Sequence, residues 1–406
     1  MDAVIGALGG WTPLLSILLI SAVYAMGERI TALTKGYISS MMVASVTFII
    51  LYLTKIIPTN VPANSTLGTV AGAFGTFVVV THLGTVISFK EFLKEWKTVV
   101  ICLSGMAGII AFSMLISARF FGRMEAYTAM TIIGGGIVAG TLSADIARAN
   151  GFPEMAAFVF LIMSFKSLIG MPIASFFLKR ECDARISRGD HLVNVAEVEG
   201  DTAAKPKLFK PVPPEKNSWL LQLTKLALVA WMGVTFAWFL TKITGSTLFS
   251  PAVMVLFFGI LFHELGFLDD NIANKAGVFN VLMLAVYHSG PANFATLDVP
   301  AIMRMAVPLI GVILVGACGI ITFALVASRP LKVTPNLAIA CGLAAMFGFP
   351  GTLILTTDAV KGAGLPEDQF QNLMDQLLPR MIIAGFTTVT VSSVILAGFI
   401  APMIFK

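Results

Sequence analysis

The chain has 406 residues, of which 57% are hydrophobic and only 12% are charged. Soluble domains carry about a quarter charged residues, so this composition excludes a soluble globular protein. The net charge of +5 does not indicate nucleic-acid binding, because the basic residues lie between apolar segments and form no soluble patch. The composition predicts an all-α membrane protein that crosses the bilayer many times.

The apolar runs form two groups of six on either side of one polar stretch. The predicted segments are 11–27, 37–54, 67–88, 98–118, 124–150 and 153–178, then 219–241, 248–266, 276–297, 306–328, 335–361 and 379–405. The polar stretch, rich in Lys, Glu, Asp and Pro, is predicted to be a solvated linker. The expected organisation is a first membrane repeat over 1–178, a linker over 179–217 and a second repeat over 218–406.

The two halves resemble each other most closely in and after their fifth segments. Gly140-Thr141-Leu142 and the stretch 145–154 correspond to Gly351-Thr352-Leu353 and the stretch 358–367. From the Asp to the Glu of these stretches, six of ten positions match by residue type. Each third segment also carries a His-x-Gly, at His82 and His288. These matches predict an internal repeat.

The positions of Lys and Arg predict how the repeats lie in the membrane. If each fifth segment dips into the membrane and returns, each half crosses five times and the second half is inverted. Of the 27 Lys and Arg residues, 18 then share the side of the linker and seven lie opposite, with Lys166 and Lys225 inside apolar runs. We therefore expect two inverted repeats of five transmembrane helices, a cytoplasmic linker and both termini outside.

Small residues interrupt each fifth segment. One half has three glycines over 134–136 and the pair Gly140-Thr141, and the other has Gly348 and Gly351-Thr352. Broken helix at membrane depth persists only where it is buried or lines a cavity, and paired breaks indicate a transporter site. We expect Gly-rich re-entrant segments whose helix N-termini bind substrate. The alternative is close helix packing through glycine.

The expected substrate-binding residues are Gly140, Thr141, Ser143, Gly351, Thr352, Lys166, His82 and His288. Lys166 lies in the middle of its segment. The corresponding residue in the second repeat is expected to be a hydroxyl residue near Ser393. Lys166 could hold a substrate carboxylate or stand in for a cation, whereas snorkelling to the interface is the alternative. For the histidines the alternative is a packing role inside the membrane.

Asp145 and Asp358 follow the two breaks at equivalent positions. A carboxylate inside a membrane segment is by default a functional hypothesis. We expect both to carry a coupling Na⁺, with hydroxyls such as those of Thr356 and Thr357 among the other ligands. Each could instead pair with the basic residue three positions later, Arg148 or Lys361.

The chain resembles the bacterial glutamate:sodium symporter family, in the wider group that includes the 2-hydroxycarboxylate symporters. The resemblance covers nearly the full length and is carried by the inverted five-helix halves, the linker and the Gly-rich segment before each last helix. The Gly-Gly-His-Gly-Thr of the family appears here as Val138-Ala139-Gly140-Thr141, which indicates a divergent branch. The resemblance implies sodium coupling, a homodimer in the bacterial inner membrane, and an elevator mechanism against a scaffold made of the first two helices of each half.

We therefore expect a secondary transporter and not an enzyme, with Na⁺ as coupling ion and no other cofactor. Its partners would be the lipid bilayer and a small organic anion or amino acid of the glutamate kind. One alternative is an exporter or cation/proton antiporter of the same fold, with proton coupling through an aspartate. Another is the membrane subunit of a sodium-pumping decarboxylase.

Overall fold

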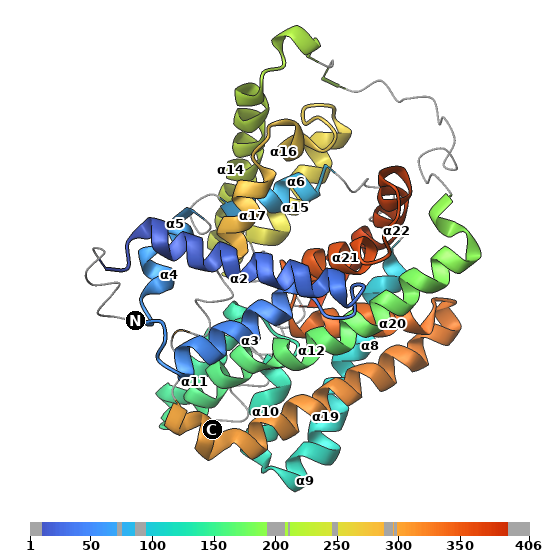
Figure 1. The fold of residues 1–406 in the computed structure, drawn as a ribbon. Coiled ribbons are helices and arrows are strands. Elements are labelled where there is room, and N and C mark those ends of the chain that lie inside the picture. The colour runs from blue at the N-terminus through green and yellow to red at the C-terminus, as the bar shows by residue number, and fades with distance from the viewer. Residues whose placement is uncertain are drawn as a thin grey trace. The chain divides into compact units, whose positions relative to one another are not determined.

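The computed structural model describes residues 10–70, 75–85, 95–192, 208–209, 212–245, 251–287, 295 and 299–388. Every regular element in these residues is a helix (Figure 1). The α-helices in chain order are α2 (Pro13–Leu33), α3 (Ser40–Leu53), α4 (Val61–Asn64), α5 (Leu67–Val70), α6 (Thr76–Leu83), α8 (Trp96–Phe112), α9 (Ala118–Phe120), α10 (Arg123–Ile132), α11 (Ile137–Ala149), α12 (Pro153–Arg188), α14 (Trp219–Thr244), α15 (Pro251–Glu264), α16 (Ile272–Lys275), α17 (Phe279–Tyr287), α19 (Val299–Leu331), α20 (Pro335–Leu343), α21 (Gly351–Lys361) and α22 (Glu367–Phe386). Short turns of other helix types are η2 (Ser113–Ser117), η3 (Asp190–Leu192), η4 (Pro214–Lys216) and η5 (Ala344–Met346).

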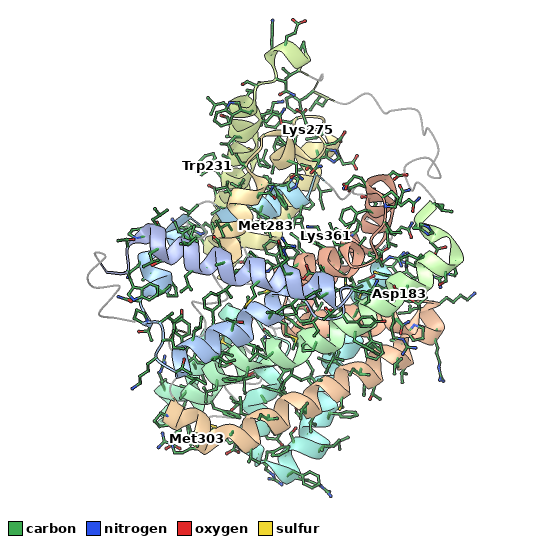
Figure 2. The ribbon with its side chains drawn as sticks, in the orientation of Figure 1. Asp183, Trp231, Lys275, Met283, Met303 and Lys361 are labelled. Carbon is green, nitrogen blue, oxygen red and sulfur yellow. The ribbon has the colours of Figure 1, made fainter. Side chains whose placement is uncertain are left out.

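Five of these helical stretches are long and apolar enough to cross a membrane. They are Pro13–Leu33, Trp96–Phe120, Glu154–Arg188, Trp219–Thr244 and Met303–Leu331. Large apolar side chains project outward from them, with Trp231 63% exposed and Met303 77% exposed (Figure 2). A helix that is apolar on its outer side as well as its inner side is a membrane span. This observation agrees with the prediction of a helical membrane protein.

The chain packs into two compact units, and each draws on both sequence halves. Unit 1 comprises Met1–Ala22, Lys55–Lys94 and Val195–Ala295, and the rest of the chain forms unit 2. Both interrupted fifth segments, α10–α11 and α20–α21, belong to unit 2. Helix α3 belongs to the same unit, although the family resemblance implied that it would form part of a separate scaffold. The inverted repeat itself concerns topology and stays a prediction.

Unit 2 is built around a close crossing of α8 and α19, which lie alongside α12 and α20 (Figure 1). A Cβ atom on Gly108 would overlap the carbonyl oxygen of Gly319, and one on Gly319 would overlap that of Gly108. Both glycines stand 32 residues before the glycine of their Gly-Thr pair. A contact between equivalent positions is what a two-fold axis through this crossing would produce. The repeat register read from the sequence stays a prediction.

Helices α12, α19 and α22 of unit 2 exceed the apolar runs that predicted them, and α19 covers Val299–Leu331 instead of 306–328. Helix α12 continues to Arg188 instead of ending at 178, and α22 begins at Glu367 instead of 379. The extension of α12 carries i,i+4 ion pairs, Lys179–Asp183 at 2.8 Å and Arg185–Glu181 at 2.9 Å, which support helix without apolar residues. An apolar run indicates only the part of a helix that is suited to lipid, so the polar ends of a helix cannot be predicted from it.

Unit 1 contains its own close approach of backbones. Helix α6 ends where Gly84 meets Gly259 of α15, so near that a Cβ on Gly84 would lie 2.7 Å from the Gly259 carbonyl carbon. Helix α14 packs on α15 in the same way, through Gly233 against Val255. Small residues thus set the helix contacts in both units, as expected in membrane proteins, where backbones approach closely.

We predict that Gly108→Val lowers the thermal stability of the purified protein strongly, because its side chain would have to displace the backbone of α19. Overpacking of this kind costs about 1–3 kcal/mol, and more where backbone must move. Ala107→Val is the matched control, since Ala107 is exposed on the same helix. A melting temperature measured in detergent should fall for Gly108→Val and stay nearly constant for Ala107→Val; equal values for both variants would contradict the crossing.

Candidate functional site

The first interrupted segment folds back on itself. The hydroxyl oxygens of Thr131 in α10 and Ser143 in α11 lie 3.3 Å apart. In one straight helix, twelve residues would separate them by about 18 Å. The chain therefore reverses over residues 133–136, where the glycines predicted a break, and both side chains are buried.

Lys166 of α12 closes this break from the side. Its amino group donates to the carbonyl oxygen of Ile132 at 3.0 Å, to that of Ile133 at 3.4 Å, and to that of Gly135. The side chain is nearly fully buried. It is therefore directed at the break and not at a membrane interface, which argues against snorkelling.

The repeat counterpart of Lys166 depends on the register chosen in the sequence. Lys166 stands thirteen residues after Pro153, and the position thirteen residues after Pro366 is the buried Pro379. The predicted counterpart near Ser393 stays a prediction, because Ser393 lies outside the described residues.

The other predicted residues of the first segment lie on α11. Gly140 packs so closely on α12 that a Cβ would overlap the sulfur of Met163. Thr141 and Asp145 are helical, and their side chains lie outside the described part of the structure. Their predicted contacts with substrate or cation therefore stay predictions.

The second interrupted segment places Gly351 and Thr352 in the first turn of α21. Thr352 is 0% exposed, and its hydroxyl oxygen has no hydrogen-bond partner among the described residues. The helix is preceded by Pro350, which supplies no side-chain cap, and the backbone N–H of Thr352 donates to the carbonyl oxygen of Gly348 at 2.9 Å. Gly385 of α22 faces this hydroxyl, and a Cβ there would lie 3.3 Å from it. Buried hydroxyls normally find a partner, and Thr352 is one of several here without a described one, together with Ser113, Ser117 and Thr128.

Asp358 fixes the start of α3. Its Oδ2 accepts hydrogen bonds from the Ser39 hydroxyl at 2.9 Å, the Ser40 hydroxyl at 2.9 Å and the Ser40 backbone N–H at 2.8 Å. The carboxylate thus serves as an acceptor at a helix N-terminus, where negative charge is favourable. These contacts give it a role that neither the cation hypothesis nor the pair with Lys361 contained.

The hydroxyls of Thr356 and Thr357 are committed to their own helix. They donate to the carbonyl oxygens of Thr352 at 2.7 Å and Leu353 at 2.9 Å. A hydroxyl oxygen that donates in this way keeps lone pairs that could face a cation. Among the described residues no three His, Cys, Asp or Glu side chains gather as a metal site.

His82 belongs to unit 1, apart from the residues above. Its Nδ1 accepts the backbone N–H of Ala273 at 3.3 Å, and its ring packs edge-on against Phe279 with centroids 5.0 Å apart. These contacts favour the packing alternative for His82. His288 lies outside the described residues.

Sequence reasoning missed Ser39, Ser40, Met163 and Gly385. Ser39 and Ser40 precede an apolar run, which is a signal for a helix N-cap, and Ser39 does cap the N–H of Met41. Nothing in the sequence links them to an aspartate more than 300 positions later. Their partner becomes visible only when α3 and α21 are seen together.

We predict that Asp358→Ala destabilises the protein by about 2–3 kcal/mol, because charge-assisted hydrogen bonds to the start of α3 are lost. Asp358→Asn keeps one carbonyl acceptor and should lose less. The control is Lys361→Gln, since Lys361 is exposed (Figure 2). Melting temperatures should fall in the order Lys361→Gln, Asp358→Asn, Asp358→Ala; an equal fall for Lys361→Gln would restore the ion-pair explanation.

No family model matches the chain, and no curated protein matches it either. The helical membrane fold and the contacts described above therefore carry the functional argument by themselves.

Proposed function

We propose that the protein is a secondary active transporter, not an enzyme, that couples Na⁺ to the symport of a small organic anion or amino acid of the glutamate kind. One observation carries the proposal: the buried Thr352 hydroxyl lacks a described partner at the uncapped N-terminus of α21, beside a helix interruption. Interrupted helices in corresponding segments are the sequence feature that best indicates a transporter site.

The chemistry of this position suits a carboxylate. The backbone N–H of Thr352 donates to the carbonyl oxygen of Gly348 at 2.9 Å, and the helix dipole favours negative charge at this end of α21. The position is closely packed, since a Cβ on Gly351 would lie 2.8 Å from the Phe347 ring and 3.0 Å from the Met171 methyl group. The Thr352 hydroxyl would donate to a substrate carboxylate, and this is the basis for an anionic or zwitterionic substrate.

Sodium would bind where helix interruption frees carbonyl oxygens. In the second half these carbonyls lie at the end of α20 and η5, near the hydroxyl-rich stretch of α21. Asp145 and Asp358 remain candidates to shape the cation site, with Asp358 acting through its place beside α3. A proton in place of sodium is the alternative for the coupling ion.

Two features support an elevator mechanism in the inner membrane of a bacterial cell. Both interrupted segments belong to unit 2, so a movement of that unit would carry both. The charge asymmetry favours both termini outside and the linker 179–217 in the cytoplasm. The homodimer follows from the family resemblance alone.

We predict that Thr352→Val abolishes ligand-induced stabilisation and leaves the ligand-free melting temperature unchanged or slightly higher. The substitution removes a hydroxyl that has no described partner and keeps the side-chain volume. Purified protein would be screened with carboxylates and amino acids, each with and without Na⁺. A ligand present at a hundred times its Kd stabilises the native state by about 2.7 kcal/mol.

Thr356→Val is the matched control for this experiment. Its hydroxyl is equally buried but donates to a carbonyl of its own helix. It should lower the ligand-free melting temperature slightly and keep the ligand-induced rise. A sodium-dependent rise that survives Thr352→Val unchanged would show that the substrate binds elsewhere.

The topology predicts that Ser187, exposed at the end of α12, faces the cytoplasm. In a background without the exposed Cys318, a cysteine at Ser187 should react with an impermeant thiol reagent only after the cells are opened. A cysteine at Ala3 should react in intact cells. Labelling of Ser187→Cys in intact cells, with none of Ala3→Cys, would invert the proposed orientation.

A further inference from the structure

The partners of Lys166 are unusual for a buried lysine. All of the partners that the structure describes for its amino group are backbone carbonyl oxygens, those of Ile132, Ile133 and Gly135, and the side chain is only 6% exposed. The other buried lysine of α12, Lys179, pairs with the carboxylate of Asp183 instead. An ammonium group has three donors and no acceptor, so three carbonyls match its hydrogen-bonding capacity.

A cluster of carbonyl oxygens at a broken helix is also what a monovalent cation needs. Selectivity filters and interrupted helices bind K⁺ or Na⁺ through such oxygens. The negative end of the α10 dipole points to the same place, because Ile132 is the last residue of that helix. A positive charge at this point therefore meets the same environment whether it is an ion or an ammonium group.

At the second break, a carbonyl oxygen accepts a hydrogen bond from a neutral donor instead of an ammonium group. Matching the Gly-Thr pairs makes Met346 the counterpart of Gly135, and its carbonyl oxygen accepts the hydroxyl of Ser167 at 3.4 Å. Neighbouring residues of α12 thus reach both breaks, with a charge at the first and a neutral donor at the second. Pro379, thirteen residues after Pro366, has no side-chain donor.

We propose that the carbonyl cluster formed by Ile132, Ile133 and Gly135 is a monovalent-cation site that the protein fills permanently with its own Lys166 ammonium. The first break therefore holds a fixed cation and binds no exchangeable ion. Any exchangeable coupling cation binds away from this carbonyl cluster. The inference concerns a site apart from Thr352, and its test uses no transport measurement, so it can fail without the proposed function failing.

The test empties the site and refills it with free ions. Lys166→Ala should lower the melting temperature of the purified protein by several degrees in choline chloride, because the carbonyls lose their donor. Ammonium or methylammonium chloride, at the same ionic strength, should restore most of the loss, and Na⁺ should restore part of it. Lys166→Met fills the space of the aliphatic stem and leaves the carbonyls without a donor, so it should be destabilised but poorly rescued.

Lys225→Ala is the matched control, because Lys225 is 8% exposed and its amino group lies over the Phe267 ring, 5.8 Å from the centroid. It should show no recovery specific to ammonium ions. Two results would overturn the proposal. One is full stability of Lys166→Met in choline chloride. The other is recovery of Lys166→Met on adding Asp145→Asn, which would make Asp145 the partner of the lysine.

Discussion

A backbone that leaves the helical path inside an apolar environment must still satisfy its N–H and C=O groups, because lipid offers no partners. This constraint explains why the two breaks lie within a compact unit and why particular side chains surround them. The carbonyl oxygens at the first break receive the ammonium of Lys166, and one at the second receives the hydroxyl of Ser167. Both donors come from α12.

The N–H side of the breaks differs from the carbonyl side. The helices that follow them, α11 and α21, begin without side-chain caps. Donors without partners are costly unless something outside the chain can meet them. Other helices, among them α10, α12, α20 and α22, also begin without a side-chain cap, and the Thr352 N–H of α21 donates to the Gly348 carbonyl oxygen. Under the proposed function, the Thr352 hydroxyl is the donor that an anionic ligand would meet.

Several parts of this picture could be predicted from the sequence. The apolar runs located the long membrane helices, and the glycines at 134–136 located the reversal of the chain. The sequence indicates Lys166 as a charge in the middle of an apolar segment and Thr352 as a hydroxyl directly after a break. The polar ends of α12 and α22 escaped prediction, because ion pairs and an amphipathic start replace the apolar run there.

Other contacts depend on residues distant in sequence, and no local pattern could indicate them. Two examples are the hydrogen bonds that Ser39 and Ser40 donate to Asp358 and the close contact of Gly140 with Met163. The division into units is another, since it assigns α3 to the unit of the interrupted segments. Sequence periodicity describes one helix at a time and does not predict which other helices it contacts.

The bond between α3 and Asp358 has a consequence for biosynthesis. Ser39 emerges from the ribosome 319 residues before the carboxylate that completes its helix start. Closing so long a loop is slow compared with forming local helix. The start of α3 therefore reaches its final packing only after the last part of the chain has been made. A chain halted before α21 would leave both serines at the start of α3 without this acceptor.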